Sequence, residues 1–317
     1  MGEDDSLPLV SVVIPTYDRP NMLFQAITSV RAQRYPHIEV LVIDDASPTP
    51  AAQAIATEDA SGMTIRCIRH ETNQGANIAR KTGITEATGE FIAFLDDDDR
   101  WHPDKLAKQV NEFAADERIG VVYTGQAYVN EAGATTTIST PTTSGDATEA
   151  ILRGASVGPF STLMVRASVI DEAGPPDERF PSWQDREWIL RLSEQCLLKP
   201  VAEPLTIRTM DSHSQISDQY RKKRDVSYPL FIETHRERAA SFGRSTERAF
   251  LADRALVLAA AALEAGYDRD ARQLALRAVR LWPTRPRGYL YLSLALGGQF
   301  LYRKAQRTKR AVSTADI

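Results

Sequence analysis

Cysteine is scarce in this sequence. Only Cys67 and Cys196 occur among the 317 residues, and they lie far apart without the spacing of a zinc site or a disulfide framework. The sequence therefore does not indicate a disulfide-rich secreted scaffold. A reducing cytoplasm is the expected compartment.

Long hydrophobic runs and an excess of basic charge are also missing. No run approaches the roughly 18 apolar residues that span a bilayer, and the acidic start at residues 1–5 lacks the apolar core of a signal peptide. The formal net charge of −4 argues against nucleic acid as the main partner. With 43% hydrophobic and 25% charged residues, the composition fits one α/β domain with an appendage, or two domains.

Strand-like and helix-like segments alternate through the first hundred residues. The expected strands are 10–14, 38–43, 64–68 and 90–95, and the expected helices are 21–33, 51–58 and 77–87. This alternation predicts a parallel sheet with helices on both faces. Ligands bind beyond the carboxyl ends of such strands, and polar motifs follow three of them directly, at residues 15–17, 44–45 and 96–99.

Four consecutive aspartates, Asp96, Asp97, Asp98 and Asp99, follow an apolar strand. Asp96 and Asp98 would lie about 7 Å apart on one face of an extended strand end. At an effective dielectric constant of about 20, their repulsion would be roughly 2 kcal/mol. A divalent cation would remove that cost, and Asp-x-Asp in oxygen-only surroundings suits Mg²⁺ or Mn²⁺. The alternative is a solvated acidic loop.

The pattern is looser beyond residue 123. Residues 132–144, rich in threonine, serine and glycine, are expected to form a hairpin or a mobile loop. The remaining expected elements are a short helix from Ala147, strands at 160–165 and 201–208, and helices at 183–195, 246–266, 269–281 and 287–300. The change to alanine- and leucine-rich helices predicts a catalytic domain at 1–222 and a C-terminal helical region at 223–317.

Five motifs in this order resemble the family-2 inverting glycosyltransferases of the GT-A fold, over roughly residues 9–219. They are Val-Ser-Val-Val-Ile-Pro-Thr-Tyr-Asp-Arg-Pro at 10–20, Val-Ile-Asp-Asp-Ala-Ser at 42–47, Asn-Gln-Gly at 73–75 with Ala-Arg at 79–80, the four aspartates with Trp-His-Pro-Asp-Lys-Leu at 101–106, and Gln-Asp-Arg-Glu-Trp-Ile-Leu-Arg at 184–191. The resemblance implies a GT-A type, Rossmann-like, mostly parallel sheet with helices on both faces.

The resemblance implies a nucleotide pocket after the first strand. Its lining would be Pro15, Thr16, Tyr17 and Arg19. The ring of Tyr17 would give the base a flat apolar face. The alternative for Tyr17 is a turn aromatic that covers the end of the sheet.

By the same resemblance, two further segments contact the nucleotide. Asp45, with Asp44 beside it, would accept a hydrogen bond from a base N–H such as that of uracil or thymine. The alternative is that these aspartates cap the following helix. Gly75 and Arg80 would border the nucleotide, with Arg80 near phosphate or base. The family often carries Arg-Asn where this chain has Arg80 and Lys81.

The resemblance also assigns the metal site. Asp96 or Asp97 would contact the ribose, and Asp98, with Asp96, would bind the metal. His213, in the loop after the last expected strand, would reach the metal or the diphosphate as that loop closes. Its alternative is an exposed histidine without a role.

The resemblance makes Asp185 the candidate general base of the transfer reaction. Inversion at a sugar carbon requires a base on the acceptor side while the nucleoside diphosphate leaves from the other side. On a helix, Asp185 would share a face with Trp188 and Ile189, whereas Glu187 and Arg191 would form a surface pair. The alternative is that Asp185 only caps this helix.

The expected function is that of an inverting, Mg²⁺- or Mn²⁺-dependent glycosyltransferase. The donor would be a nucleotide-diphosphate sugar, expected to be a UDP-sugar. The acceptor would be a glycan or a polyprenyl-linked saccharide in cell-surface polysaccharide or glycoprotein assembly. The alternatives are a sugar-phosphate nucleotidyltransferase, an aspartyl phosphatase and a non-catalytic nucleotide-sugar-binding protein.

The C-terminal end is basic. Its cations are Arg303, Lys304, Arg307, Lys309 and Arg310, which follow a leucine-rich segment. Such a segment could dock on an anionic surface, which would make the chain peripheral on the cytoplasmic face of a membrane. The alternative is a solvated basic tail.

Overall fold

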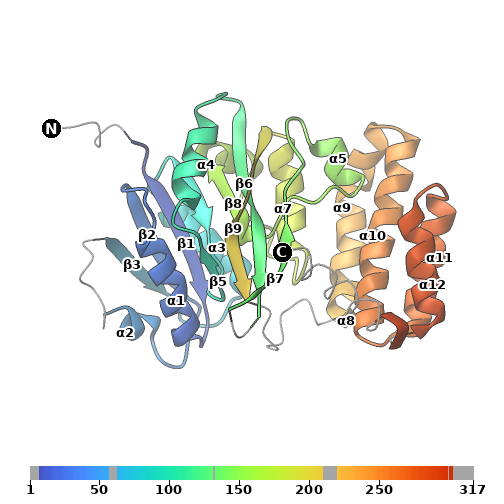
Figure 1. Ribbon diagram of the computed structural model, residues 1–317, viewed down its shortest axis with the longest axis horizontal. Coiled ribbons are helices and arrows are strands. Elements are labelled where there is room, and N and C mark those ends of the chain that lie inside the picture. Colours follow the sequence, from blue (N-terminus) through green and yellow to red (C-terminus); the bar gives the residue numbers. More distant parts are fainter. Residues whose placement is uncertain (1–6, 57–62, 131–132, 210–219, 299, 303–317) are drawn as a thin grey trace. The chain divides into compact units, whose positions relative to one another are not determined.

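The computed structural model describes residues 7–56, 63–130, 133–209, 220–298 and 300–302 (Figure 1). The chain divides into two compact units. The first comprises Met1–Ala147, Val157–Glu178 and Asp185–Asp211, and the second comprises Thr148–Ser156, Arg179–Gln184 and Ser212–Ile317. The domain boundary expected after residue 222 stays a prediction.

The first unit is built on a mixed sheet. Its strands are β1 (Val10–Thr16), β2 (Ile38–Asp44), β3 (Thr64–Arg69), β4 (Phe91–Phe94), β5 (Asp99–Trp101), β6 (Ile119–Val129), β7 (Thr135–Ser139), β8 (Leu163–Arg166) and β9 (Leu197–Thr209). They lie in the order β3-β2-β1-β4-β8-β6-β9-β5, and β7 pairs with β6. Strands β1 to β4 are parallel to one another, whereas β8 runs antiparallel to both β4 and β6.

Helices cover both faces of this sheet. They are α1 (Pro20–Arg31), α2 (Ala51–Ala56), α3 (Ala76–Glu86), α4 (Lys105–Phe113), α6 (Ala167–Ala173) and α7 (Gln184–Ser193), the last belonging to this unit from Asp185 onward. Val12 of β1 packs in one cluster with Leu23 of α1 and Leu106 of α4. Val13, the next residue of β1, faces α3 on the opposite side. The α/β fold with helices on both faces, expected from the sequence, is confirmed.

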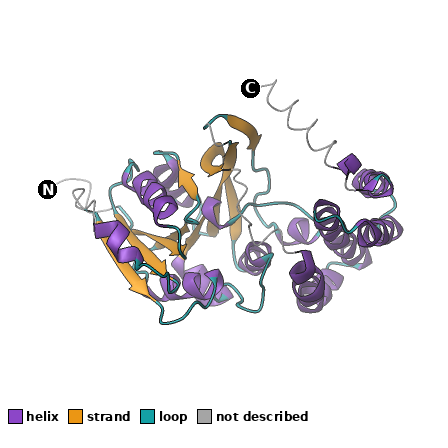
Figure 2. Ribbon diagram, turned by 90° about the horizontal axis from the view of Figure 1, so that it is seen from below, coloured by secondary structure: helices purple, strands orange, loops and turns teal. Residues whose placement is uncertain are grey.

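The second unit is helical (Figure 2). It contains α5 (Thr148–Leu152), α8 (Tyr220–Lys222), the π-helical turn η4 (Lys223–Ser227), α9 (Tyr228–Ser241), α10 (Arg244–Glu264), α11 (Asp268–Leu281) and α12 (Pro286–Leu296). Small residues let α10 and α11 approach closely, since Ala252 and Ala255 share a buried cluster with Ala278. No helix of the described ranges is long and apolar enough to cross a membrane.

Several elements differ from the expectation. Residues 132–144, expected to form a hairpin or a mobile loop, contribute only the second strand of a hairpin, since β7 pairs with β6. The strand expected at 160–165 begins as a 3-10 turn, η2 (Phe160–Thr162), and continues as β8. Short strand β5 and helices α4, α6 and α9 were not predicted from the sequence.

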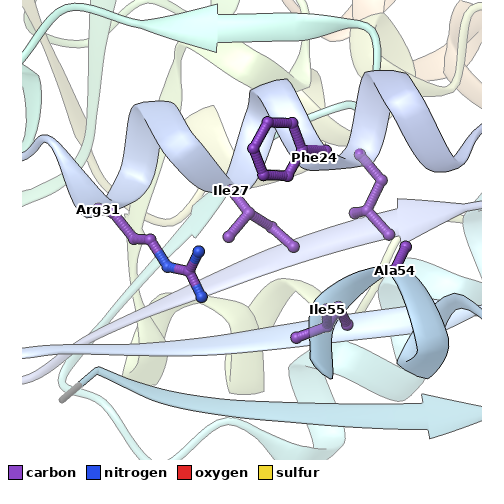
Figure 3. Close-up of a pocket in the computed structure, with 6 residues that line it drawn as sticks. Phe24, Ile27, Arg31, Ala54 and Ile55 are labelled. Atoms are coloured by element: carbon purple, nitrogen blue, oxygen red, sulfur yellow. The ribbon is translucent and has the colours of Figure 1, made fainter. Parts of the chain in front are cut away.

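A small hollow lies between α1 and α2 (Figure 3). It is lined by Leu23, Phe24, Ile27, Arg31, Ala54 and Ile55. The lining is apolar apart from Arg31. None of the residues that the sequence assigned to ligand binding takes part in it.

The contact of α3 with β1 depends on Gly83. A Cβ at this position would lie 2.3 Å from Cγ1 of Val13, which is fully buried. Gly83→Ala is expected to destabilise the fold by about 1 kcal/mol, because overpacking costs about 1–3 kcal/mol and the gain in helix propensity is about 1 kcal/mol. Urea unfolding measures this. Val13→Ala added to Gly83→Ala should cost less than the sum of the two single changes, and Lys81→Ala on the exposed face should cost little. A stability of Gly83→Ala equal to wild type would contradict this packing.

Glu39 holds the start of β4 through its buried carboxylate. Its Oε1 accepts hydrogen bonds from Ser11 Oγ at 2.6 Å, Thr88 N at 2.7 Å and Thr88 Oγ1 at 2.8 Å. Burial by itself would raise the pKa of Glu39, but these hydrogen bonds outweigh it and lower the pKa. Glu39→Gln is therefore expected to cost about 1–3 kcal/mol at pH 7.

The loss of stability caused by Glu39→Gln should become smaller at low pH. Since the pKa of Glu39 is lower in the folded state, its stabilising contribution is full above the unfolded value of about 4.3 and is lost as the pH falls through the folded pKa. The stability difference between wild type and Glu39→Gln should thus narrow below about pH 4. Glu86→Gln, at an exposed ion pair with Arg66, is the control and should change little at either pH. A difference that stays constant with pH would refute this role.

Candidate functional site

The carboxyl ends of β1 and β4 bring two of the predicted motifs together. Thr16, the last residue of β1, donates a hydrogen bond from Oγ1 to Asp97 Oδ2 at 2.8 Å. Arg19 Nη1 lies 3.1 Å from Asp97 Oδ1 and 3.4 Å from Asp98 Oδ2. Pro15 is buried within β1, and Tyr17, which follows the strand, is 47% exposed. The region between β1 and the aspartates therefore combines a cation, an exposed ring and carboxylates.

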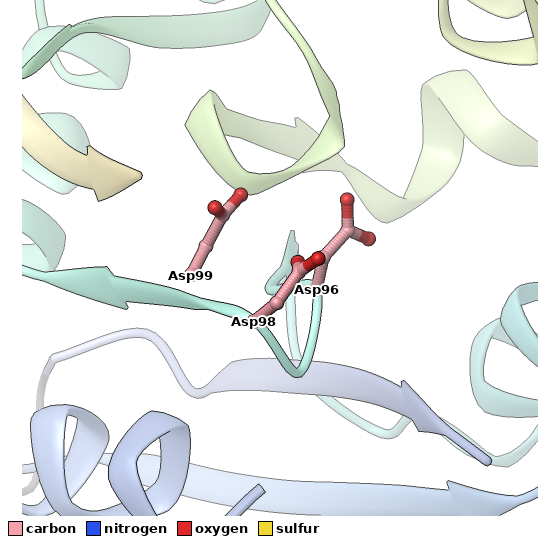
Figure 4. A group of neighbouring side chains, drawn as sticks. All are labelled: Asp96, Asp98 and Asp99. Atoms are coloured by element: carbon pink, nitrogen blue, oxygen red, sulfur yellow. The ribbon is translucent and has the colours of Figure 1, made fainter. Parts of the chain in front are cut away.

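The four aspartates divide into two groups. Asp97 turns toward Thr16 and Arg19. The side chains of Asp96, Asp98 and Asp99 converge instead, each offering a carboxylate oxygen within 4.8 Å of the others (Figure 4). The sequence had assigned Asp96 and Asp98 to the metal but gave no role to Asp99.

Arginines neutralise part of this charge. Arg80 Nη2 lies 2.5 Å from Asp96 Oδ1, and Arg208 Nε lies 3.2 Å from Asp99 Oδ1. Asp98 has only the longer contact with Arg19. Of the four carboxylates, Asp98 is thus the least neutralised within the described structure.

Burial makes these carboxyl groups hard to ionise. It raises the pKa of Asp97 to about 6, against the opposing effect of Arg19 and Thr16. Burial also raises the pKa of Asp99 to about 7, although Arg208 acts in the opposite direction. Burial and the neighbouring charge of Asp96 raise the pKa of Asp98. A cation bound among these groups would favour their charged forms.

The converging carboxylates fit a hard divalent cation. Asp99 Oδ2 is buried and has no hydrogen-bond partner among the described residues, so it is free to act as a ligand. Asp96 and Asp98 are partly exposed and complete an oxygen-only donor set. Such a set suits Mg²⁺ or Mn²⁺ rather than a softer metal. His213, the other predicted ligand, lies outside the described residues.

Asp44 is the last residue of β2 and Asp45 follows it, and the two carboxylates have different surroundings. Asp44 accepts hydrogen bonds from Ser47 N, Ala51 N and Arg69 Nη1, so it caps α2 and forms an ion pair. The capping role left open by the sequence is therefore present at Asp44. Asp45 accepts instead from the ring of His70 and from the loop before α3.

Arg80 connects α3 to the aspartates. Its guanidinium is almost fully buried and lies over the ring of Phe160, 3.9 Å from the ring centroid. Besides Asp96, it contacts Asn77 Oδ1 at 3.5 Å. Gly75, predicted to border the nucleotide, precedes α3 with a φ of 91° and donates its N–H to Asp45.

Asp185 lies half-buried in the first turn of α7, where its Oδ1 accepts the N–H of Arg186 at 2.8 Å. The helix is connected to the aspartates by aromatic packing. Trp188 contacts Phe94, at the end of β4, and Phe160, with ring centroids 5.1 and 5.6 Å apart. Since Arg80 stacks on Phe160 and pairs with Asp96, α7 and the cluster of Asp96, Asp98 and Asp99 share one packed support.

One expectation on α7 was wrong. Glu187 and Arg191 do form the expected ion pair, at 2.8 Å, but Glu187 is only 1% exposed. Arg191 also donates to the carbonyl oxygens of Ala173 and Pro175. The pair therefore connects α7 to the end of α6 inside the protein and is not a surface contact.

Four contributors to the site were missed in the sequence. They are Asp99, Arg208, His70 and Phe160. Asp99 and Arg208 face each other across the β5–β9 pair. No local sequence pattern predicts which residues of these two strands pair. His70 could have been noticed, because it follows a predicted strand just as Asp44 and Asp45 do.

Comparison with protein families identifies the chain. The family model described as glycosyl transferase family 2 matches residues 11–172, slightly more than half of the chain. TuaG of Bacillus subtilis, a glycosyltransferase assigned to teichuronic acid biosynthesis, is 33% identical over 126 residues, or 40% of this chain and 50% of TuaG. The amylovoran biosynthesis glycosyltransferase AmsB of Erwinia amylovora is 35% identical over 103 residues, or 32% of this chain and 34% of AmsB. The chain thus spans half or less of the length of these two relatives.

Solved structures share the fold at low sequence identity. Residues 1–349 of Staphylococcus aureus TarS superpose with a TM-score of 0.59 at 16% identity, covering 94% of this chain and 92% of that chain. The mannosyltransferase PcManGT of Pyrobaculum calidifontis, solved with GDP-Man and Mn²⁺, gives 0.58 at 16% identity, covering 98% and 89%. The chain belongs to glycosyl transferase family 2, and it has the mixed α/β fold of GT-A glycosyltransferases, followed by C-terminal helices.

Proposed function

We propose that the chain transfers a sugar, with inversion, from a nucleotide-diphosphate sugar to a saccharide acceptor, with Mg²⁺ or Mn²⁺ as cofactor. The observation that carries this proposal is the convergence of Asp96, Asp98 and Asp99 beside Arg19 at the carboxyl ends of β1 and β4. The TarS structures with UDP and UDP-GlcNAc, and PcManGT with GDP-Man and Mn²⁺, support a nucleotide-sugar donor.

The residues of the chain divide the work of this reaction. Asp98, Asp99 and Asp96 would hold the metal, which when bound neutralises charge on the leaving diphosphate. Asp185 accepts the proton of the acceptor hydroxyl while the oxygen of that hydroxyl forms a bond to the anomeric carbon. The bond between that carbon and the diphosphate breaks on the opposite side, and the nucleoside diphosphate leaves. Tyr17 and Arg19 border the donor, as the sequence predicts.

A UDP-sugar is the proposed donor. The sequence-based reason is that a carboxylate at Asp45 favours a base with an N–H, as uracil has. The two TarS complexes contain uridine nucleotides, whereas PcManGT contains GDP-Man, so both UDP and GDP belong in the test.

The proposed acceptor is a growing saccharide, either free or carried on a polyprenyl lipid. The names of TuaG and AmsB place those relatives in the synthesis of teichuronic acid and amylovoran. These two names support a polysaccharide as the product.

The proposed membrane contact gains support from apolar side chains in and after α12, since Leu296 and Phe300 are 67% and 81% exposed. The basic residues of 303–310 lie outside the described residues.

The competing functions fit less well. A nucleotidyltransferase would be expected to carry a glycine-rich basic loop after the first strand, and residues 15–20 contain no glycine. A phosphatase would need a nucleophilic aspartate with its other motifs downstream, and the sequence contains no convincing match to them. A non-catalytic sensor would bind donor without needing Asp185.

Removal of the least neutralised carboxylate tests the donor site. Asp98→Ala should abolish metal-dependent binding, so that the Kd for the bound nucleotide with Mn²⁺ rises more than roughly tenfold, to its metal-free value. Titration calorimetry with UDP, GDP and dTDP, with and without Mn²⁺, measures this. Asp116→Ala, at a partly exposed aspartate that pairs with Arg118, is the control and should bind as wild type does. If wild type binds none of the three nucleotides in a metal-dependent way, the transferase proposal fails.

Asp185→Asn separates catalysis from binding. The amide keeps the size of the side chain but accepts no proton, so turnover should fall by roughly 10²–10⁴-fold while the donor Kd changes by less than about twofold. The assay is UDP release from UDP-GlcNAc and UDP-glucose, with and without saccharide acceptors. Glu194→Gln, at the exposed end of α7, serves as the control. Unchanged turnover in Asp185→Asn would show that Asp185 is not the base. If wild type binds the donor but shows no turnover, the chain is better described as a non-catalytic nucleotide-sugar-binding protein.

A further inference from the structure

The two adjacent aspartates at the end of β2 differ in how many hydrogen bonds they can still accept. A carboxylate has about four acceptor positions. In Asp44 four donors use these positions. They are the side chain of Ser47, Ser47 N at 2.8 Å, Ala51 N at 3.0 Å and Arg69 Nη1 at 2.6 Å. Asp44 is fully buried. It therefore has no position left for a ligand.

Asp45 is bound by three donors. Its Oδ1 accepts from His70 Nδ1 at 2.8 Å and from Gln74 N at 2.9 Å, and its Oδ2 accepts from Gly75 N at 2.7 Å. Oδ1 thus accepts two hydrogen bonds, whereas Oδ2 accepts one and keeps a further acceptor position among the described residues. The side chain is 5% exposed, so this position lies at the margin of the buried region.

His70 is held at both ring nitrogens. It follows β3, and its Nδ1 contacts Asp45 while its Nε2 lies 3.0 Å from Thr82 Oγ1 of α3. Because a carboxylate accepts and does not donate, Nδ1 carries the proton of this contact. In a neutral ring, Nε2 then accepts from the Thr82 hydroxyl. The ring cannot turn without losing both hydrogen bonds, and its side chain is 9% exposed.

We propose that His70 is a positioning residue that sets base specificity through Asp45. By occupying Oδ1, it fixes the carboxylate so that the remaining position on Oδ2 is offered to an N–H of the nucleotide base. Uracil carries an N–H at position 3, where cytosine has an acceptor nitrogen that a carboxylate repels. This inference rests on the proposed nucleotide-sugar function and adds the residue that would select uridine over cytidine nucleotides.

Two substitutions of His70 separate its hydrogen bonds. Asn places its amide nitrogen near the position of Nδ1, so His70→Asn keeps the donor to Asp45 and loses the contact with Thr82. Gln places its amide nitrogen near Nε2, so His70→Gln loses the donor to Asp45. Thr82→Val removes the other partner and leaves the Asp45 contact in place.

The experiment is calorimetric titration of the full chain with UDP and with CDP in the presence of Mn²⁺. Wild type should prefer UDP. His70→Gln should reduce the preference for UDP over CDP by roughly tenfold, mainly by weakening UDP binding. His70→Asn and Thr82→Val should keep the preference to within about threefold. Thermal unfolding of each variant shows whether the fold is retained.

The possible outcomes separate a failure of the role of His70 from a failure of the proposed nucleotide-sugar function. An equal loss of UDP and CDP binding in folded His70→Gln would overturn the inference, because a purely structural role of His70 predicts that result. Equal binding of UDP and CDP by wild type, or binding of GDP alone, would also overturn it but keep the nucleotide-sugar function. Absence of metal-dependent binding of UDP, GDP and dTDP by wild type would overturn both.

Discussion

Mutual repulsion of carboxylates at the end of β4 is the constraint on which the site depends. Asp96, Asp98 and Asp99 bring oxygens within 4.8 Å of one another, and burial removes much of the water that would screen them. Arg80 and Arg208 offset part of this charge. The remaining negative charge, centred on Asp98, is what makes the site suitable for a divalent cation.

The surrounding structure holds these charges in place. Arg80 reaches Asp96 from α3 and rests on Phe160, which packs against Trp188 of α7. The helix that carries Asp185 thus shares its support with the carboxylates of the candidate metal site. A change in the packing of Trp188 would disturb both the candidate metal site and the candidate base, so the two are coupled by packing rather than by direct contact.

The surroundings of Asp45, on the proposed nucleotide side of the site, are organised by hydrogen bonds rather than by charge repulsion. Asp45 accepts the N–H groups of residues 74 and 75, which joins the end of β2 to the start of α3. His70 adds a third donor from the end of β3. Each of these residues follows a parallel strand, so the order β3-β2-β1-β4 brings them to the same edge of the sheet.

The sequence by itself determined the parallel half of the sheet, its helices and the motifs at the strand ends, because hydrophobic periodicity and strand-end polar residues are local signals. Only the tertiary structure decided which carboxylates converge. Asp97 turns to Thr16, while Asp99 faces Arg208 across the antiparallel β5–β9 pair. It likewise placed Glu187 inside the protein rather than on its surface. Such outcomes depend on the register and packing of separate segments of the chain, and a local pattern does not encode them.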